Sequence, residues 1–503
     1  MSNDYPSSMG LFRKISDFLK RRDWLFWLTF IPIVCLKLAI FHFGASQYLF
    51  FGRHSSFGMN FGVVESFSDF SYYYMNFVRA FVQGNLPYTE ALYMIEGVQT
   101  YIYTPLFVYV LGAFYFVPSE LLFPDIQMTA LLLSRDLNFL RVGFAFIVFD
   151  LATCAVMYAA ARKLTENQFI PVVVLLLFAL NPISLWWGNY LWLSTPIHTF
   201  FLVLGFFFII CGKFRWAIVL VTVAAMVKQT GALLIPLIWF LEYRQGMKQL
   251  LISVGITAII GIIFSMPYLI LFPTTYFSAI TRGMGPYWFY ELPPDPTHPV
   301  PVSVLAFFWP EPFKSIVLTL VYYAIPWIIA MTFFWFISYY IPKHPPSAYL
   351  EPLLLVTLLL SLSAHIFMPR GIYKFYLIAL LPFLILFGVI IRGPVVPVQG
   401  IRCPIQSRGA SFMAKFPSWI IEPIHQFREN SLRLVNNLTT WWFVLVGLVS
   451  IGIFSVYRYF THVILLGLFI VLLLYGSYRY VWKRKMSKKN AATSWGDSDA
   501  DTG

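Results

Sequence analysis

The chain is poor in charged residues and rich in apolar ones. Lys, Arg, Asp and Glu make up 11% of its 503 residues, whereas 59% are hydrophobic and 19% are aromatic. A soluble globular domain carries about 25% charged and about 45–50% apolar residues. The shortage of charge therefore excludes both a set of soluble domains, which the length alone would suggest, and an intrinsically disordered chain. The composition predicts an integral membrane protein built mostly of spanning helices.

Cysteine is scarce as well. Cys35, Cys154, Cys211 and Cys403 lie in or near apolar segments without CxxC spacing, which argues against a structural zinc site or a disulfide scaffold. The sequence shows no nucleotide-phosphate loop, no internal repeat and no pair of inverted halves, and the last absence weakens the case for a secondary transporter. The first apolar run lacks a small-residue cleavage site, so we expect it to stay as a span.

A spanning helix needs roughly 20 apolar residues, and about twelve runs qualify. They are 24–45, 105–124, 137–161, 168–187, 196–212, 215–241, 248–272, 313–340, 350–367, 375–392, 439–459 and 461–481. Basic clusters precede the first run and follow the last, which predicts that both termini are cytoplasmic and that the number of spans is even. The net charge of +13 is therefore interpreted as a topology signal and not as nucleic-acid binding.

The apolar runs and the charges divide the chain into parts. These are a basic cytoplasmic N-terminus (1–23), an N-terminal transmembrane module (24–272) with a first external loop (46–104), a second external loop (273–312), a C-terminal transmembrane module (313–392), a basic cytoplasmic loop (393–438) with an amphipathic helix at 411–435, two further spans (439–481) and a cytoplasmic tail (482–503). Strict alternation places Arg162–Lys163 and Lys213–Arg215 outside, against the positive-inside tendency. Segments between 105 and 241 are therefore candidates for re-entrant or broken helices.

The first external loop contains an amphipathic helix. From Phe67 to Val82, apolar residues recur at spacings of three and four, which predicts a helix lying in the membrane interface. Gly84 followed by Pro87 ends it. Asp69 lies near its start, where the helix dipole favours a carboxylate, so a capping role alone would also explain this residue.

A second motif, Tyr101-Ile-Tyr103-Thr104-Pro105-Leu106, precedes the next apolar run. The first loop resembles that of the GT-C superfamily, which consists of polytopic glycosyltransferases that use polyprenyl-phosphate sugars. The resemblance lies in the order of four features: an external Asp, an aromatic helix, Gly-x-x-Pro-Tyr and Tyr-x-Tyr-x-Pro-Leu. The resemblance implies that Asp69 is the catalytic base and that Tyr103-Thr104-Pro105-Leu106 is the motif that follows it.

Further motifs extend the resemblance over roughly residues 1–392. In chain order they are Arg141 opening a span that contains Asp150, Asn181-Pro182 before Gly188-Asn189, Lys228-Gln229-Thr230, Arg282-Gly283, and Met368-Pro369-Arg370 before Tyr373-Lys374. Many family members carry Gly-Gln-x-Asp where this chain has Gly188-Asn189 and no Asp. Each motif is short, so the match depends on their order and on their side of the membrane.

Transfer of a sugar from a lipid phosphate needs a base for the acceptor hydroxyl and cations for the leaving phosphate. Asp69 is the candidate base. The candidate phosphate-binding residues are Arg282, Arg370, Lys374 and Lys228, and the candidate substrate contacts are Tyr72, Tyr103, His298 and His365. Anchoring at the membrane interface explains the two arginines equally well. A pairing with Asp150 would explain Lys228. The two histidines are each isolated, and a lone histidine is usually structural. No DxD pattern surrounds Asp69, so we expect no metal.

The sequence therefore predicts an all-α integral membrane protein with a GT-C fold of about 12 transmembrane helices and external interfacial helices. The resemblance implies an inverting glycosyltransferase, with mannose as the first choice of sugar. Its partners would be a polyprenyl- or dolichyl-phosphate donor and a lipid-linked glycan, glycolipid or protein acceptor, with no cofactor, no nucleic acid and a monomeric state. A prokaryotic cell membrane is the expected location, with the endoplasmic reticulum as the alternative.

A lipid or sugar transporter without chemistry is the rival hypothesis. It would use Lys228, Asp150 and Arg141 as charges along a pathway, because ionisable residues inside spans are rare and mark function. The two hypotheses differ in where the charges meet. An enzyme needs them at the external interface, whereas a transporter needs them near mid-membrane.

Overall fold

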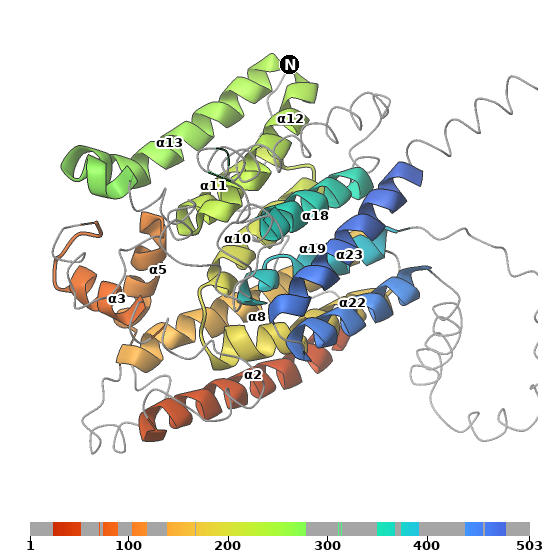
Figure 1. Ribbon diagram of the computed structural model, residues 1–503, viewed down its shortest axis with the longest axis horizontal. Coiled ribbons are helices and arrows are strands. Elements are labelled where there is room, and N and C mark those ends of the chain that lie inside the picture. Colours follow the sequence, from red (N-terminus) through yellow and green to blue (C-terminus); the bar gives the residue numbers. More distant parts are fainter. Residues whose placement is uncertain are drawn as a thin grey trace, which may run out of the picture.

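The computed structural model describes part of the chain. The described residues are 24–51, 70, 74–88, 103–117, 138–165, 167–277, 310, 313, 350–367, 374–391, 438–455 and 458–478. Within these ranges every regular element is a helix (Figure 1).

Most of the helices are α-helices. They are α2 (Trp24–Phe51), α3 (Met75–Val82), α5 (Pro105–Tyr115), α8 (Asn138–Leu164), α9 (Phe169–Ala179), α10 (Thr195–Ile210), α11 (Phe214–Val227), α12 (Ile235–Gln245), α13 (Met247–Leu271), α18 (Leu350–Phe367), α19 (Leu381–Ile390), α22 (Leu438–Ser455) and α23 (Arg458–Ser477). Three segments are irregular. They are the π-helix η3 (Ser184–Tyr190) and the 3₁₀-helices η4 (Gln229–Leu234) and η8 (Lys374–Ile378).

Four described helices are long and apolar enough to cross a membrane, and a fifth span results if the bent pair α9–η3 is counted as one. The four lie in α2, α8, α13 and α22. Shorter apolar helical stretches of 10–17 residues lie in α5, α10, α11, α18, η8–α19 and α23. The chain is thus compatible with an α-helical membrane protein, and the total of about twelve spans stays a prediction. The helix at 411–435 and the run at 313–340, apart from its first residue, lie outside the described residues.

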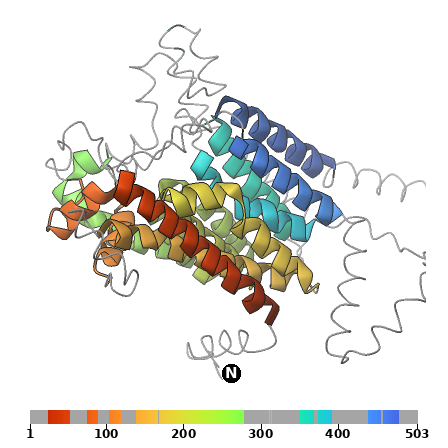
Figure 2. The same cartoon turned by 90° about the horizontal axis from the view of Figure 1, so that it is seen from below.

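Helices α2 and α8 pack side by side in opposite directions. The ring of Phe26 lies 4.9 Å from that of Tyr158, and the ring of Phe41 lies 5.9 Å from that of Phe144 (centroid distances). The start of α2 therefore lies level with the end of α8. Figure 2 shows α2, in red, running along the outside of the bundle.

Basic residues gather at one end of the bundle. Lys163 and Lys213 both act electrostatically on Cys211, and Arg215 Nη2 donates to Gln249 Oε1 at 3.1 Å. We call this the basic end, and it holds Trp24, Arg162, Lys163, Lys213, Arg215 and Lys248. We call the opposite end the loop end, where α2 finishes, α8 and α10 begin, and α11 finishes at Val227.

This arrangement corrects the alternation that the sequence suggested. The run at 105–124 contains α5, which ends at Tyr115. Its 11 residues make a helix of about 16 Å, too short for a hydrocarbon core of about 30 Å. Because α8 starts at the loop end, Arg162 and Lys163 fall at the same end as Trp24, and the conflict with the positive-inside tendency disappears.

Two other predicted spans are broken. The run at 215–241 is not one span but a hairpin, because α11 ends at Val227 and the chain returns through η4 and α12. Helix α12 then packs against α13, where Trp239 Nε1 donates to Thr257 Oγ1 at 3.2 Å. The run at 168–187 bends by 61° between α9 and η3. The runs at 137–161 and 248–272 are confirmed as the continuous helices α8 and α13.

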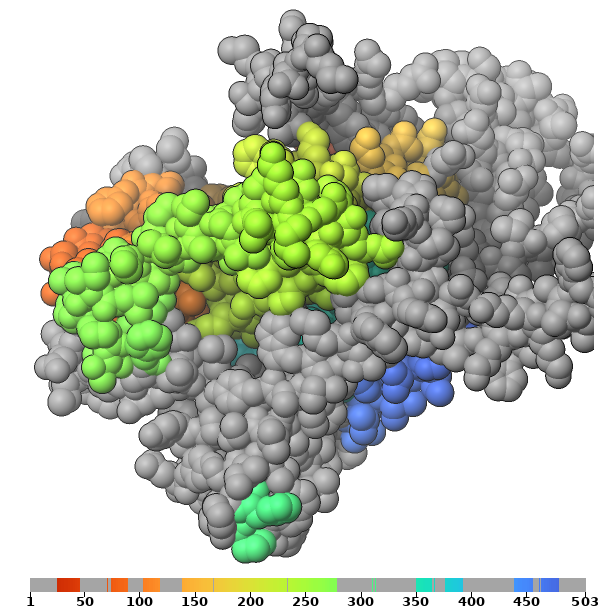
Figure 3. Space-filling view, turned by 90° about the horizontal axis from the view of Figure 1, so that it is seen from above, coloured from red at the N-terminus to blue at the C-terminus, as the bar shows by residue number. Residues whose placement is uncertain are grey.

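The last two helices are part of the bundle. Trp442 Nε1 in α22 donates to the Leu384 carbonyl in α19 at 2.7 Å, and Tyr475 in α23 donates to Glu351 in α18 at 2.7 Å. Large apolar side chains remain exposed along the outer helices, as on α13 with Leu251, Ile259 and Ile263. Figure 3 shows α13, in green, lying open along one face. In a membrane, such faces contact lipid.

A buried ion pair joins α2 to α8. Lys37 Nζ lies 2.5 Å from Asp150 Oδ2, and both side chains are fully buried. Asp150 also accepts hydrogen bonds from Ser184 Oγ at 2.9 Å and from Asn189 Nδ2 at 3.1 Å. The carboxylate thus ties two spans to η3. Three donors surround a charge that would be costly to bury alone.

Removing one charge of this pair should destabilise the fold strongly. We expect Lys37→Met to lower the free energy of unfolding by about 3–5 kcal/mol, because it leaves Asp150 buried and uncompensated. The double variant Lys37→Met/Asp150→Asn should recover most of this loss. Thermal unfolding in detergent measures both, with Lys248→Met, an exposed lysine at the basic end, as control. A single variant as stable as the control would contradict the assigned role of the pair.

The orientation of the bundle is testable at Cys211. By the positive-inside tendency, the basic end should face the cytoplasm. With the other three cysteines replaced, an impermeant maleimide should label Cys211 in inverted vesicles and not in intact cells. Burial raises the pKa of the Cys211 thiol more than Lys163 and Lys213 lower it, so labelling should quicken with rising pH. Labelling from outside intact cells would reverse the orientation.

Candidate functional site

The first-loop helix α3 lies on the loop end of the bundle. Phe70 is fully buried and contacts the rings of Phe139 at 4.5 Å and Phe146 at 5.8 Å in α8. Helix α3 ends at Val82, and Gly84 follows with φ +92°, a left-handed conformation that glycine adopts without strain. The predicted helix is thus confirmed over its second half, including its end at Gly84. Its apolar face packs on the bundle.

Tyrosine hydroxyls meet beneath this helix. The Tyr74 and Tyr103 hydroxyls are 3.2 Å apart, and Tyr103 is also 3.4 Å from Ser194 Oγ. The Ser194 backbone N–H donates to the Tyr74 hydroxyl at 3.3 Å, and Tyr88 donates to the Tyr103 carbonyl at 2.5 Å. We call these four residues the tyrosine cluster. It joins the first loop to the start of α10.

Two more tyrosines extend the aromatic packing toward α13. The Tyr88 ring lies 5.1 Å from that of Tyr268 and 5.0 Å from that of Tyr276. Tyr276 donates to Ser265 Oγ at 2.7 Å. Burial raises the pKa of Tyr276, and that of Tyr109 in α5. These hydroxyls therefore remain protonated donors well above neutral pH.

Lys228 lies at the tip of the α11–η4 hairpin. Its backbone is extended (φ −150°, ψ 131°) and separates the two helices. The side chain is 8% exposed, and its Nζ lies 3.7 Å from the centre of the Tyr376 ring in η8. In η4, Thr230 Oγ1 is 3.4 Å from His198 Nε2 of α10. We call Lys228, Tyr376, His198 and Thr230 the lysine cluster.

The two clusters share one end of the bundle. Thr104, the residue after Tyr103, donates from Oγ1 to the Ala225 carbonyl in the last turn of α11 at 3.2 Å. Ser194 and His198 lie one turn apart at the start of α10. The first loop and the Lys228 hairpin therefore pack against the same helix start.

Irregular backbone is concentrated in this region. Tyr376 of η8 contacts Lys228, the residue before η4, and an added Cβ on Gly188 in η3 would lie 3.6 Å from Ile378 in η8. Non-helical backbone at membrane depth is tolerated only inside protein or beside a water-filled cavity, because its polar groups need partners. Three such breaks meeting at one end indicate a functional region.

Of the residues predicted for the site, two are described with their side chains. Tyr103 lies in the tyrosine cluster and Lys228 in the lysine cluster. Lys374 begins η8, two residues before Tyr376, and His365 lies in α18, but their side chains are outside the described part. The other five predicted residues, Asp69, Tyr72, Arg282, His298 and Arg370, lie outside the described residues.

The suggested pairing of Lys228 with Asp150 is wrong. Asp150 is paired with Lys37. Arg141, the third charge of the transporter hypothesis, donates to Asn138 Oδ1 at 2.9 Å near the loop end. The three charges of that hypothesis therefore do not form one cluster.

Sequence reasoning missed several residues of this region. Lys37 was readable as a lone cation inside the first apolar run, a position that indicates function or pairing. Ser194 and Tyr376 carried no signal, because each joins its cluster only through contacts between distant segments.

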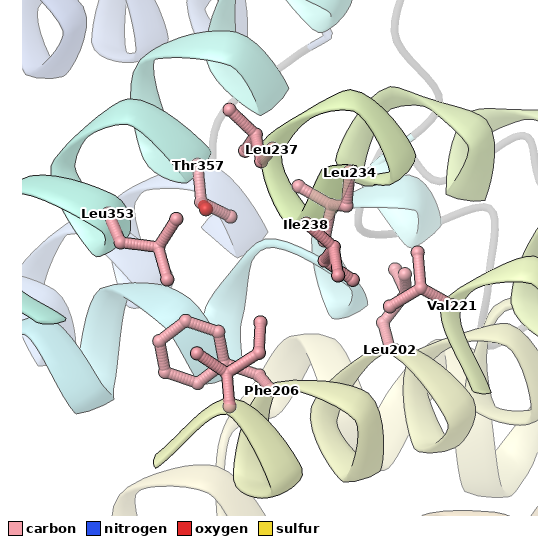
Figure 4. Close-up of a pocket in the computed structure, with 9 residues that line it drawn as sticks. Leu202, Phe206, Val221, Leu234, Leu237, Ile238, Leu353 and Thr357 are labelled. Carbon is pink, nitrogen blue, oxygen red and sulfur yellow. The ribbon is translucent and has the colours of Figure 1, made fainter. Parts of the chain in front are cut away.

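One cavity lies among α10, α11, α12 and α18 (Figure 4). It has room for about one water molecule and is lined by Leu, Ile, Val and Phe side chains with Thr357. It offers no charged group, so it is distinct from the lysine cluster. Among the described residues, no three His, Cys, Asp or Glu side chains form a possible metal site.

Comparisons with protein-family models, with curated proteins and with solved structures give no match for this chain.

The hairpin that presents Lys228 should depend on Gly231. A Cβ there would lie 2.6 Å from Ala225 N and 2.8 Å from Ala224 C, and backbone atoms move at a cost. We expect Gly231→Ala to lower the free energy of unfolding by about 1–3 kcal/mol. Thermal unfolding beside Gly261→Ala, where no atom lies within 4 Å of the added Cβ, measures it. Equal stability of the two variants would refute the close approach.

Proposed function

We propose that this chain is a membrane glycosyltransferase of the GT-C type. It would transfer a sugar, with mannose as the first candidate, from a polyprenyl- or dolichyl-phosphate donor. The acceptor would be a lipid-linked glycan, a glycolipid or a protein on the non-cytoplasmic side. The observation that supports this most is the packing of the first loop and of Lys228 at the same end of the bundle.

The geometry suits the proposed chemistry in two ways. Phe70, which is bonded directly to Asp69 in the chain, and Tyr74 are both buried in the bundle. Lys228 contacts η8, the segment that begins with Lys374 and follows Arg370 in the chain. Phe70, which follows the proposed base in the chain, and Lys228 with its partner Tyr376 in η8 thus lie at the loop end.

In the proposed reaction, the acceptor hydroxyl oxygen attacks the anomeric carbon of the donor. The bond between that carbon and the phosphate oxygen breaks, and the phosphate leaves with the electron pair. Asp69 takes the proton of the hydroxyl, which would otherwise be a poor nucleophile. Lys228 acts as a point charge on the leaving phosphate. A single displacement of this kind inverts the anomeric configuration.

Of the three charges that the transporter hypothesis uses, Asp150 lies within the spans, where it pairs with Lys37. The carboxylate of Asp150 already accepts from three side chains. These bonds hold α2, α8 and η3 together, and a carrier that moved these helices would have to break the bonds in each cycle. We therefore place the glycosyltransferase first.

Sugar transfer by the purified full chain tests the proposal. A panel of radiolabelled polyprenyl-phosphate sugars and lipid-linked acceptors would be offered to wild type, Asp69→Asn, Lys228→Met and Lys248→Met. We expect the first variant to lower kcat by about 10²–10⁴-fold and the second by about 10²–10³-fold. The exposed Lys248 serves as the matched control and should change little.

The possible outcomes separate the hypotheses. Full activity of Asp69→Asn would keep the enzyme and remove Asp69 from its mechanism. An effect of Lys228→Met no larger than that of Lys248→Met would remove the phosphate role. Lack of transfer by wild type with every donor and acceptor, together with uptake of a lipid or sugar into vesicles, would favour the transporter.

A further inference from the structure

Trp192 has an unusual backbone conformation. Its φ is +52°, and its side chain is fully buried. A bulky residue in the left-handed region is an outlier that persists only where the surroundings enforce it. Its indole Nε1 donates to the Asn189 carbonyl at 2.9 Å, which closes the turn that follows η3.

The buried ion pair holds this turn in place. Asn189 Nδ2 donates to Asp150 Oδ2 at 3.1 Å and to the Ser184 carbonyl at 2.9 Å. Asp150 is in turn fixed by Lys37. The position of Trp192 is therefore set from within the membrane-spanning part of the bundle.

Two glycines allow the turn to approach the spans. An added Cβ on Gly143 of α8 would lie 2.8 Å from Trp192 Cε3 and 3.0 Å from Cδ2, and one on Gly44 of α2 would lie 2.9 Å from the Tyr190 carbonyl. The distances of 2.8 and 2.9 Å are shorter than those that real Cβ atoms show. The indole thus lies directly on the α8 backbone.

The indole also contacts Phe70 of the first loop, Phe139 of α8 and Phe41 of α2. The Trp192 ring lies 5.2 Å from the rings of Phe70 and Phe139 and 4.9 Å from that of Phe41. Two residues later, Ser194 bonds Tyr74 and Tyr103. A shift of the indole away from Gly143 therefore has to move Phe70, Phe139 or Phe41.

We propose that Trp192 is a positioning residue that seats the first-loop helix on the bundle. The ion pair fixes the turn that contains Trp192, and Trp192 in turn fixes Phe70 by direct contact and Tyr74 through Ser194. This inference rests on the proposed function where it concerns catalysis, because Asp69 is bonded to Phe70. Trp192 itself need not touch the substrate.

The test is a steric displacement with a matched control. Gly143→Ala pushes on the indole, whereas Gly255→Ala in α13 meets no atom within 4 Å. We expect Gly143→Ala to speed hydrogen exchange of the α3 amides by about tenfold or more, as local opening becomes easier. In the transfer assay kcat should fall by about tenfold or more, with KM nearly unchanged. Gly255→Ala should match wild type in both.

A second variant separates positioning from simple damage. Phenylalanine at position 192 is smaller than tryptophan and makes room for the added methyl group. The double variant Gly143→Ala/Trp192→Phe should therefore recover much of the lost kcat and much of the protection of the α3 amides from hydrogen exchange. Such a rescue means that the two changes are not additive. If Gly143→Ala does not fold, Trp192→Phe alone should still speed exchange in α3 and leave α22 unchanged.

Three results would overturn the inference. They are unchanged exchange in α3 for Gly143→Ala, faster exchange spread evenly over all helices, and a double variant whose losses simply add. Hydrogen exchange needs no activity, so it decides the positioning role even if wild type transfers no sugar. In that case the proposed function fails separately.

Discussion

The ion pair between Lys37 and Asp150 is the constraint on which the rest of the loop end depends. A buried carboxylate and ammonium each cost several kcal/mol of desolvation, and only close pairing with further hydrogen bonds compensates them. Asp150 meets this requirement with donors from α2 and from η3. The charges therefore fix where the broken segment lies against two spans, which apolar packing alone does less specifically.

The breaks in the helices follow from the same requirement. At η3, η4 and η8 the regular i to i−4 bonds are interrupted, and the backbone needs other partners. Side chains supply some of them: Asn189 bonds the Ser184 carbonyl, Trp192 bonds the Asn189 carbonyl, and Thr104 bonds that of Ala225. These side-chain bonds thus gather polar groups at the loop end.

Local sequence features predicted the parts of this fold that depend on neighbouring residues. The apolar runs of α8 and α13, Pro105 at the start of α5 and the end of α3 at Gly84 are of this kind. Hydropathy could not reveal the hairpin at Lys228, because both of its arms are apolar. The partners Lys37 and Asp150 are 113 residues apart, and the φ of Trp192 is imposed by packing. The placement of Tyr103 against Ser194 was equally beyond any local pattern.

Rigidity at the loop end bears on the choice between enzyme and carrier. A carrier must rearrange the segments around its site so that each side of the membrane gains access in turn. Here the first loop, η3 and the start of α10 are joined by the tyrosine cluster and by the close contact of Trp192 with Gly143. Asp150 and Lys37, which hold η3 against the spans, are both fully buried. An enzyme gains from the same rigidity, because transition-state stabilisation depends on groups held in fixed positions.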